Sequence, residues 1–193
     1  ESLVTLDAYS DMANIDAVPY LYRDADHFTK FWFSPIGDKI LKTVGDEGNF
    51  KIIGPQNRGA RIVTSKVPFK NLQELKGLKL RVPNIQVYIE TWKTLGASPT
   101  PLAFTETFTA IQQNTVVGQE NPTIESYNMS FYDVCKYLIT TNHVFSADMF
   151  IFNKQYFEAL PADTQRILTE AITEAAQWRN AECLRIEADY FKR

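Results

Sequence analysis

The sequence contains few of the residues that hold metals or attack substrates. Its two cysteines, Cys135 and Cys183, show neither a CxxC pair nor metal-ligand spacing. Its two histidines, His27 and His143, are also far apart, so we expect no metal site. Both cysteines lie in apolar, periodic segments, which is typical of small buried hydrophobic residues. A disulfide between them remains an open alternative in an oxidising compartment.

Glycine motifs, long apolar runs and excess charge are also lacking. The eight glycines form neither GxGxxG nor GxxxxGK[ST], and there is no GxSxG. The sequence therefore has no motif for binding a nucleotide cofactor or for hydrolysis by a nucleophilic serine. A net charge of −3 gives no basic surface for nucleic acid or an anionic membrane. No apolar run approaches the roughly 20 residues that span a bilayer. We therefore expect no cofactor, no nucleic-acid partner and no enzyme activity.

What the sequence does contain is the composition of a globular protein. With 193 residues and 45% hydrophobic content, it suits one large domain or two small ones. Apolar spacing and turn residues predict helices and extended segments in alternation. The expected helices are 24–32, 36–44, 85–95, a short one from 105, and 163–193. The expected extended segments are 18–22, 50–54, 62–64, 78–82, 99–101 and 139–151, the last one interrupted at 142–143.

One stretch, from Gly77 to Pro122, carries the main candidates for a binding site. Arg81 ends an apolar strand-like run that Pro83 closes, and its planar fork of donors suits a carboxylate. Asn121 precedes Pro122, a position that disfavours helix and leaves the side-chain amide free to point at a ligand. A fixed cation and a fixed amide are the parts of an anion site. The alternative is a surface salt-bridge arginine and an ordinary turn asparagine.

Further residues complete a concave site in this interpretation. Arg61 follows Gly59 at the start of a β-branched run and adds a second cation, while Phe104 and Phe145 add apolar walls. The sequence shows no general acid or base beside these residues, which favours binding over catalysis.

Long blocks of the sequence resemble one known family. KGLKLRVP, LGASPTPLAFTETFTAIQQ and GQENP, in this order, resemble the signature region of the substrate-binding proteins of tripartite ATP-independent periplasmic (TRAP) transporters, the DctP-like family. The similarity continues through VPYLYRDADHF, GARIVTSKVP, FYDVCKYLITTNHVFS and LPADTQRILTEA, and so covers nearly the whole chain. The sequence departs from the family pattern at two positions beside the site: Val117 stands where the family usually has an acidic residue, and Asn114 where it has a glycine. These departures affect the expected geometry of the local loop.

The resemblance implies an α/β fold, that of a two-lobed periplasmic binding protein of type II-like architecture. It would have mixed sheets, hinge strands and a long helix, at about 163–193, that spans both lobes. The implied lobes are 1–58 with 147–186, and 59–146. Because the family is longer than this chain, we expect an N-terminal part of the first lobe, with its opening β-α-β units, to be missing before Glu1.

Carried over position by position, the resemblance implies a role for each candidate residue. Arg81 would form a bidentate salt bridge with the ligand carboxylate, Asn121 would steady that carboxylate, and Phe104 would close on the ligand. Arg61 corresponds to an auxiliary arginine. Glu1 resembles the start of a pocket segment that accepts ligand hydroxyls in sugar-acid-binding members.

The implied function is capture of a small carboxylate solute in the periplasm and its delivery to the membrane subunits of a TRAP transporter. We expect a monomer, and a hydroxylated sugar acid such as a uronate ahead of a C4-dicarboxylate. Two alternatives remain open: a ligand-binding sensor module of the same fold, and a two-lobed α/β enzyme that acts on an organic acid.

Overall fold

A computed structural model describes residues 1–192 and divides the chain into two compact units. Unit 1 holds Glu1–Gly59 and Val144–Asp189. Unit 2 holds Ala60–His143 together with the residues from Tyr190 on. Both units combine helices with strands, so the chain is an α/β protein, as expected.

The lobe limits expected from the resemblance are 1–58 with 147–186 against 59–146. These limits predict which parts of the chain unfold and move together as one lobe, and they remain a prediction. Hydrogen exchange that shows each of these ranges opening as one cooperative unit is the measurement that decides them.

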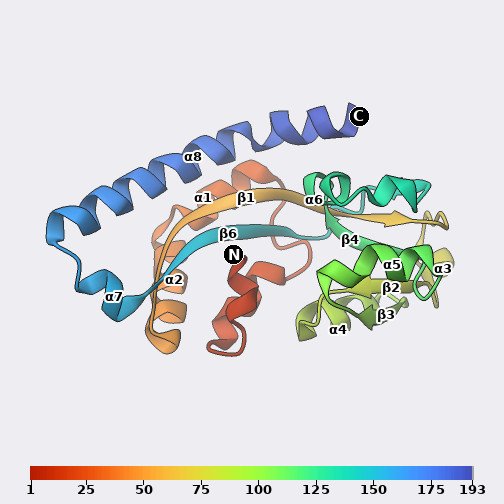
Figure 1. Cartoon of the computed structure of the whole chain (residues 1–193), viewed down its shortest axis with the longest axis horizontal. Coiled ribbons are helices and arrows are strands. Elements are labelled where there is room, and N and C mark those ends of the chain that lie inside the picture. Colours follow the sequence, from red (N-terminus) through yellow and green to blue (C-terminus); the bar gives the residue numbers. More distant parts are fainter. Residues whose placement is uncertain (193) are drawn as a thin grey trace. The chain divides into compact units, whose positions relative to one another are not determined.

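The labels in Figure 1 follow the chain order of the elements. The α-helices are α1 (Ala25–Trp32), α2 (Pro35–Gly48), α3 (Leu72–Leu75), α4 (Gln86–Thr94), α5 (Thr107–Gln112), α6 (Thr123–Asn128), α7 (Lys154–Glu158) and α8 (Ala162–Lys192). Short 3-10 helices are η1 (Leu3–Leu6), η2 (Asp11–Ala17), η3 (Phe104–Glu106) and η4 (Phe131–Asp133). The strands are β1 (Phe50–Ser65), β2 (Lys79–Val82), β3 (Ser98–Pro101), β4 (Gly118–Pro122), β5 (Tyr137–Ile139) and β6 (Phe145–Asn153).

Local signals explain where the first helices begin and end. Asp24 caps α1, because its carboxylate accepts the backbone N–H of His27 at 2.7 Å. Ser34 caps α2, and Pro35 occupies the first turn, where a missing N–H costs little. Asn49 ends α2 in the left-handed conformation, at φ 59°. The two separate helices expected at 24–32 and 36–44 are therefore confirmed.

The core of unit 1 is built from its helices and from the paired strands β1 and β6, which lie side by side in Figure 1. Its buried residues are Leu3, Leu6, Ala13, Tyr22, Phe28, Trp32, Ile40, Val44, Ile52, Ala147 and Met149. Gly54 on β1 adopts φ 70°, and a Cβ there would lie 2.5 Å from Cγ2 of Ile172. Helix α8 therefore packs on β1 at a place where only glycine fits.

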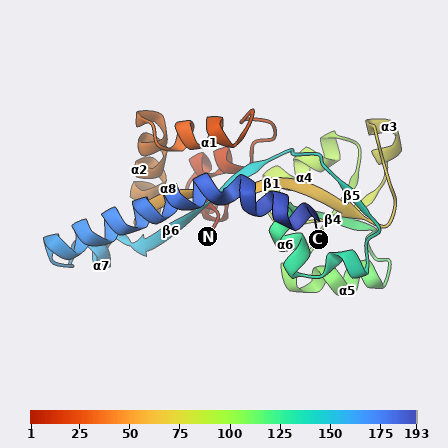
Figure 2. The same ribbon diagram turned by 90° about the horizontal axis from the view of Figure 1, so that it is seen from above.

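Unit 2 is organised on a mixed sheet with the strand order β3-β2-β4-β1-β5. β2 is parallel to β3 and β4, whereas β1 is antiparallel to β4 and β5. Figure 2 shows α4 and α5 on opposite sides of β4. At Gly118 the strands β4 and β1 approach closely, since a Cβ there would lie 2.6 Å from the carbonyl oxygen of Thr64. This glycine lets β4 pair with β1 and with β2 at once.

Two expectations about extended segments are wrong. The segments 50–54 and 62–64 are not separate strands, because β1 continues through both. β1 pairs with β6, and its residues 61–65 also pair with β4 and β5. This pairing keeps residues 55–61 in one strand, although Gly59 adopts the positive φ of 94°. The segment 18–22 forms turns instead of a strand.

Candidate functional site

Three neighbouring strands of unit 2 carry the predicted polar residues. β2 and β4 are parallel neighbours, so their carboxyl ends, which carry Arg81 and Asn121, lie at one edge of the sheet. β1 is antiparallel to β4, and Arg61 pairs in register with Pro122 at the same edge. Open α/β sheets bind ligands at the carboxyl ends of their parallel strands. The arrangement is therefore that of a candidate binding edge.

Arg61 is neutralised by a buried carboxylate. Its Nε donates to Oε2 of Glu120 at 2.6 Å and its Nη2 to Oε1 at 2.8 Å, the two-pronged geometry of strong ion pairs. The Tyr88 ring centroid lies 4.9 Å from Cζ of Arg61. Arg61 and Glu120 are both buried. Because the two charges cancel, Arg61 brings little net charge to the binding edge.

Burial alone would disfavour both charges of this pair. Burial raises the pKa of Glu120, but Arg61 and a hydrogen bond with His143 outweigh it and hold that pKa well below its ordinary value. Burial likewise lowers the pKa of Arg61, and Glu120 outweighs it, so that this pKa is raised. Nε2 of His143 lies 2.9 Å from Oε2 of Glu120, and Nδ1 lies 2.9 Å from Oγ1 of Thr141. The carboxylate is thus ionised and fixed in place.

Arg81 is a second buried cation with different surroundings. Its Nε and Nη2 both donate to the carbonyl oxygen of Leu102, at 3.0 and 2.6 Å. No carboxylate of residues 1–192 forms a salt bridge with it. Burial lowers the pKa of Arg81 to about 10, with Glu120 opposing the shift and Arg61 adding to it. The guanidinium is charged at neutral pH, and an anion that reached it would stabilise it.

Phe104 lies beside Arg81. Cζ of Arg81 is 5.7 Å from the ring centroid, and the ring meets that of Phe131 edge-on at 6.3 Å between centroids. Phe131 is fully buried, whereas Phe104 is 37% exposed. Phe104 therefore has apolar surface available next to the buried cation.

Asn121 is held from two sides. Its Oδ1 accepts from Nη2 of Arg61 at 3.2 Å, and its Nδ2 donates to Oε1 of Gln119 at 2.6 Å. The residue is 5% exposed. Its amide therefore has a defined orientation at the edge that also carries Arg81.

The remaining two predicted site residues, Phe145 and Glu1, belong to unit 1. Phe145 opens β6 and packs, partly buried, against the core of that unit. Glu1 is exposed, and its carbonyl oxygen accepts the backbone N–H of Met149 at 2.8 Å. Four predicted residues meet in unit 2, and the part of Phe145 and Glu1 in a site remains a prediction.

Two members of this arrangement, Glu120 and His143, are not among the candidates that the sequence suggests. Glu120 stands between Gln119 and Asn121 in a strand that is buried along its whole length. Three consecutive polar residues in a buried strand need internal partners, and this run is a signal for a buried cation nearby. His143 has no comparable signal, because it lies in irregular chain after β5.

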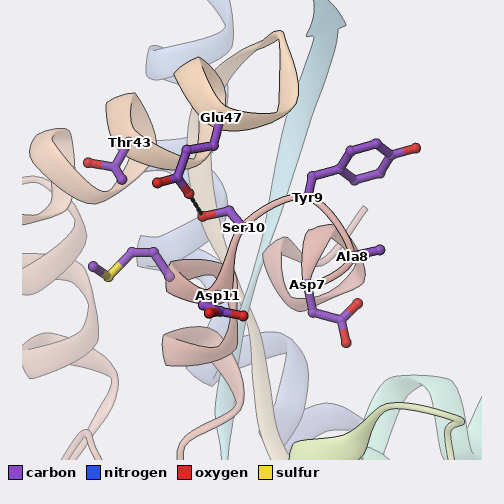
Figure 3. Close-up of a pocket in the computed structure, with 8 residues that line it drawn as sticks. Asp7, Ala8, Tyr9, Ser10, Asp11, Thr43 and Glu47 are labelled. Atoms are coloured by element: carbon purple, nitrogen blue, oxygen red, sulfur yellow. Dashed lines mark hydrogen bonds between the residues drawn. The ribbon is translucent and has the colours of Figure 1, made fainter.

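A pocket of about 420 Å³ in unit 1 is unsuited to binding an anion (Figure 3). Its lining residues are Asp7, Ala8, Tyr9, Ser10, Asp11, Met12, Thr43 and Glu47. Ser10 donates a hydrogen bond to Glu47 across it. Three of the lining side chains are carboxylates and none is a cation, so an organic acid would be repelled.

Within residues 1–192 no group of three or more His, Cys, Asp or Glu side chains is arranged to hold a metal ion. No helix in the same range combines the length and the apolar character needed to cross a bilayer. Cys135 and Cys183 are both buried, and no disulfide joins them.

An α/β chain of two units, with buried arginines and an oriented amide at one sheet edge, has the features of a protein that binds small solutes. The chain belongs to the DctP family, the bacterial extracellular solute-binding proteins of family 7, whose model matches residues 2–193. The family and the two-lobed α/β fold class expected from the sequence are thereby confirmed.

Solved structures and curated relatives agree with this assignment. A TRAP periplasmic solute-binding protein from Roseobacter denitrificans OCh 114, with bound L-galactonate, has a TM-score of 0.91 at 31% identity, covering 99% of this chain and 64% of that chain. One from Desulfovibrio salexigens, with bound orotic acid, has a TM-score of 0.93 at 30% identity, covering 100% and 62%. The sialic acid-binding periplasmic protein SiaP of Vibrio cholerae is 34% identical over 155 residues, 80% of this chain and 48% of its own. The chain spans about half the length of the curated relatives it matches.

Proposed function

We propose that the protein captures a small organic acid in the periplasm and delivers it to the membrane subunits of a TRAP transporter. Arg81 carries this proposal. It is a buried guanidinium without a salt-bridge partner among residues 1–192, while Arg61 beside it is already paired with Glu120. A carboxylate that binds Arg81 offsets the cost of burying that charge, and a neutral solute does not.

The contacts of Arg81 also indicate which part of its guanidinium receives the carboxylate. The carbonyl of Leu102 takes the N–H of Nε and one N–H of Nη2. The remaining hydrogens, on Nη1 and Nη2, form the end of the fork, which matches the two oxygens of a carboxylate. In this proposal Asn121 donates a hydrogen bond to the same carboxylate, and Phe104 covers an apolar part of the solute. Arg61 has a supporting role, because it holds Asn121.

The relatives favour a class of ligand. L-galactonate and sialic acid are hydroxylated sugar acids, and orotic acid is also a carboxylic acid. We therefore place a hydroxylated sugar acid, such as a uronate, ahead of a C4-dicarboxylate. We further propose that the protein acts as a monomer and performs no chemistry on the acid, because the groups around Arg81 are an ion pair, an amide and an aromatic ring.

A thermal-shift panel tests the proposal. Sugar acids and dicarboxylates are each compared with the corresponding carboxamide or alcohol. We expect stabilisation by at least one acid and little by its neutral analogue. Equal stabilisation by acid and analogue would contradict the role of Arg81, and turnover of a bound acid, detected by mass spectrometry, would favour the enzyme alternative.

A further inference from the structure

Gln119 is a buried residue of β4 whose side chain is hydrogen-bonded at both ends. Its Oε1 accepts from Nδ2 of Asn121 at 2.6 Å. Its Nε2 donates to Oγ1 of Thr64 at 2.8 Å and to Oγ of Ser126 at 3.2 Å. Since both its acceptor and its donor are used inside the protein, Gln119 is placed to hold Asn121 and not to contact a solute.

The direction of these hydrogen bonds is set by Arg61. A guanidinium can only donate, so the Asn121 atom that faces Nη2 of Arg61 is Oδ1, the acceptor. The other end of that amide, Nδ2, then faces Gln119, which must present its own Oε1. Nε2 of Gln119 is left for the two hydroxyls, which are able to accept. Each amide orientation is thus determined by the one before it.

We propose that Gln119 is a positioning residue that, together with Arg61, holds Asn121 so that its amide presents a donor to the solute. This inference rests on the proposed function. With Oδ1 turned toward Arg61 and one Nδ2 hydrogen bound by Gln119, the second Nδ2 hydrogen is the donor that Asn121 has left to offer. A carboxylate oxygen accepts it. The NH2 group of a carboxamide can only donate, so two donors would face each other, which costs binding energy.

The bond to Gln119 is the shorter of the two that hold Asn121, 2.6 Å against 3.2 Å from Arg61. Losing it leaves Asn121 held only by the longer bond from Arg61, so its amide should turn more readily and offer Oδ1 to a donor of the solute. The specificity of the site would then change in a way that simple loss of packing does not produce, because the neutral analogue gains while the acid loses.

Two substitutions at Gln119 separate positioning from charge and from packing. Gln119→Met keeps the length of the side chain and removes both hydrogen-bonding ends. Gln119→Glu keeps an acceptor for Nδ2 of Asn121, and the hydroxyls of Thr64 and Ser126 can rotate to donate to it. The matched control is Gln113→Met, the same change at an exposed glutamine.

The experiment is calorimetric titration of the unmodified protein and the three variants with L-galactonate, β-D-galacturonate and L-malate, each paired with its carboxamide. We expect Gln119→Met to lower the acid-over-carboxamide affinity ratio about tenfold. Gln119→Glu should weaken all acids through its added negative charge. Because its carboxylate still accepts from Asn121, it should leave the affinity for the neutral carboxamides of the two sugar acids within about twofold of that of the unmodified protein. Gln113→Met should change neither quantity.

A retained ratio in Gln119→Met, or a rise in carboxamide affinity in Gln119→Glu as large as that in Gln119→Met, would overturn the positioning role while leaving the proposed function intact. If Gln119→Met does not fold, Gln119→Glu alone decides, because a raised affinity for the neutral carboxamides in that variant contradicts the inference. Failure of the unmodified protein to prefer any of the three acids over its carboxamide would instead contradict the proposed function, and the inference with it.

Discussion

Nε of Arg61 and Oε2 of Glu120 lie 2.6 Å apart on neighbouring antiparallel strands, and both side chains are buried. Removing one member of such a pair is costly, because the other is left as a buried, unpaired charge.

Glu120→Gln should therefore lower the free energy of unfolding by about 3–5 kcal/mol. The double variant Arg61→Met, Glu120→Leu should lose less than the sum of the two single changes, since it leaves no charge behind. Urea unfolding of all variants measures this coupling. The control is Asp26→Asn, which breaks the exposed pair with Lys30 and should cost less than about 1 kcal/mol. Strict additivity at Arg61 and Glu120 would contradict the prediction.

Lysine substitutions separate the roles of the two arginines. Arg81→Lys keeps the charge and loses the fork, and should weaken binding of the preferred acid by about 2–5 kcal/mol with little change in Tm. Arg61→Lys should weaken binding less and lower Tm more, because it disturbs the pair with Glu120. Calorimetric titration and thermal unfolding of both variants provide the two readouts. A larger loss of affinity at Arg61 would mean that the roles are reversed.

Phe104 should matter for binding and little for stability. Phe104→Ala removes a partly exposed ring next to Arg81, so we expect roughly five- to tenfold weaker acid binding, equivalent to about 1 kcal/mol. Phe131→Ala, at the buried ring that contacts Phe104, should instead cost about 3–5 kcal/mol of stability. Titration and urea unfolding of both variants test the contrast, and a Phe104 variant with unchanged affinity would exclude that residue from the site.

Glu120 predicts a loss of stability in acid. Burial raises its pKa, but Arg61 and His143 bring it down to about 2, below the ordinary value of 4.5. The unfolded chain therefore binds this proton more readily than the folded one, and stability that is complete above pH 4.5 is lost as the pH falls toward 2. Between pH 5 and 3 we expect unmodified protein to lose about 2 kcal/mol more than Glu120→Gln. If the free energies of unfolding of unmodified protein and Glu120→Gln changed equally with pH, the lowered pKa of Glu120 would be contradicted.

The titration of Asp16 should make stability change with pH in the opposite direction, and at higher pH. It is buried in unit 1, where it accepts from Oγ of Ser2 at 2.8 Å and from the backbone N–H of Ala147 at 2.7 Å. Burial outweighs these donors and raises its pKa from 3.8 to about 6. The folded protein therefore holds this proton more tightly, and the contribution of Asp16 to stability falls as the pH rises from about 4 to 6.

Asp16→Asn removes that titration. Between pH 4.5 and 7, unmodified protein should lose about 2 kcal/mol relative to the variant. Urea unfolding at the two pH values measures the difference. An Asp16→Asn variant with the same pH dependence as the parent would show that this carboxyl does not titrate in the range.

The sequence predicts some parts of the site because their signals are local. Arg81 lies between Leu80 and Val82, and all three are buried, so the strand-bound arginine expected there exists. The partner of Arg61 is not predictable in the same way. Glu120 is 59 residues away, and only the pairing of β1 with β4 brings the two together.

The same distinction explains the errors in the fold. The run between 54 and 59 contains glycine and proline, which locally favour a turn, yet strand pairing on either side holds it in β1. The cap at Asp24 depends only on residues three positions apart, and it was predictable. Long-range pairing overrides weak local preferences, whereas a cap does not depend on distant chain.

The place of β4 in its sheet has a consequence for how the protein is made. β4 lies between β2 and β1, so residues 60–65 and 79–82 emerge from the ribosome well before the strand that joins them. Until β4 has been synthesised, Arg61 has no Glu120, and the edges of β1 and β2 that face β4 stay unpaired. Completion of this sheet therefore depends on contacts between residues far apart in the chain, whose loop-closure entropy must be overcome before the contacts form.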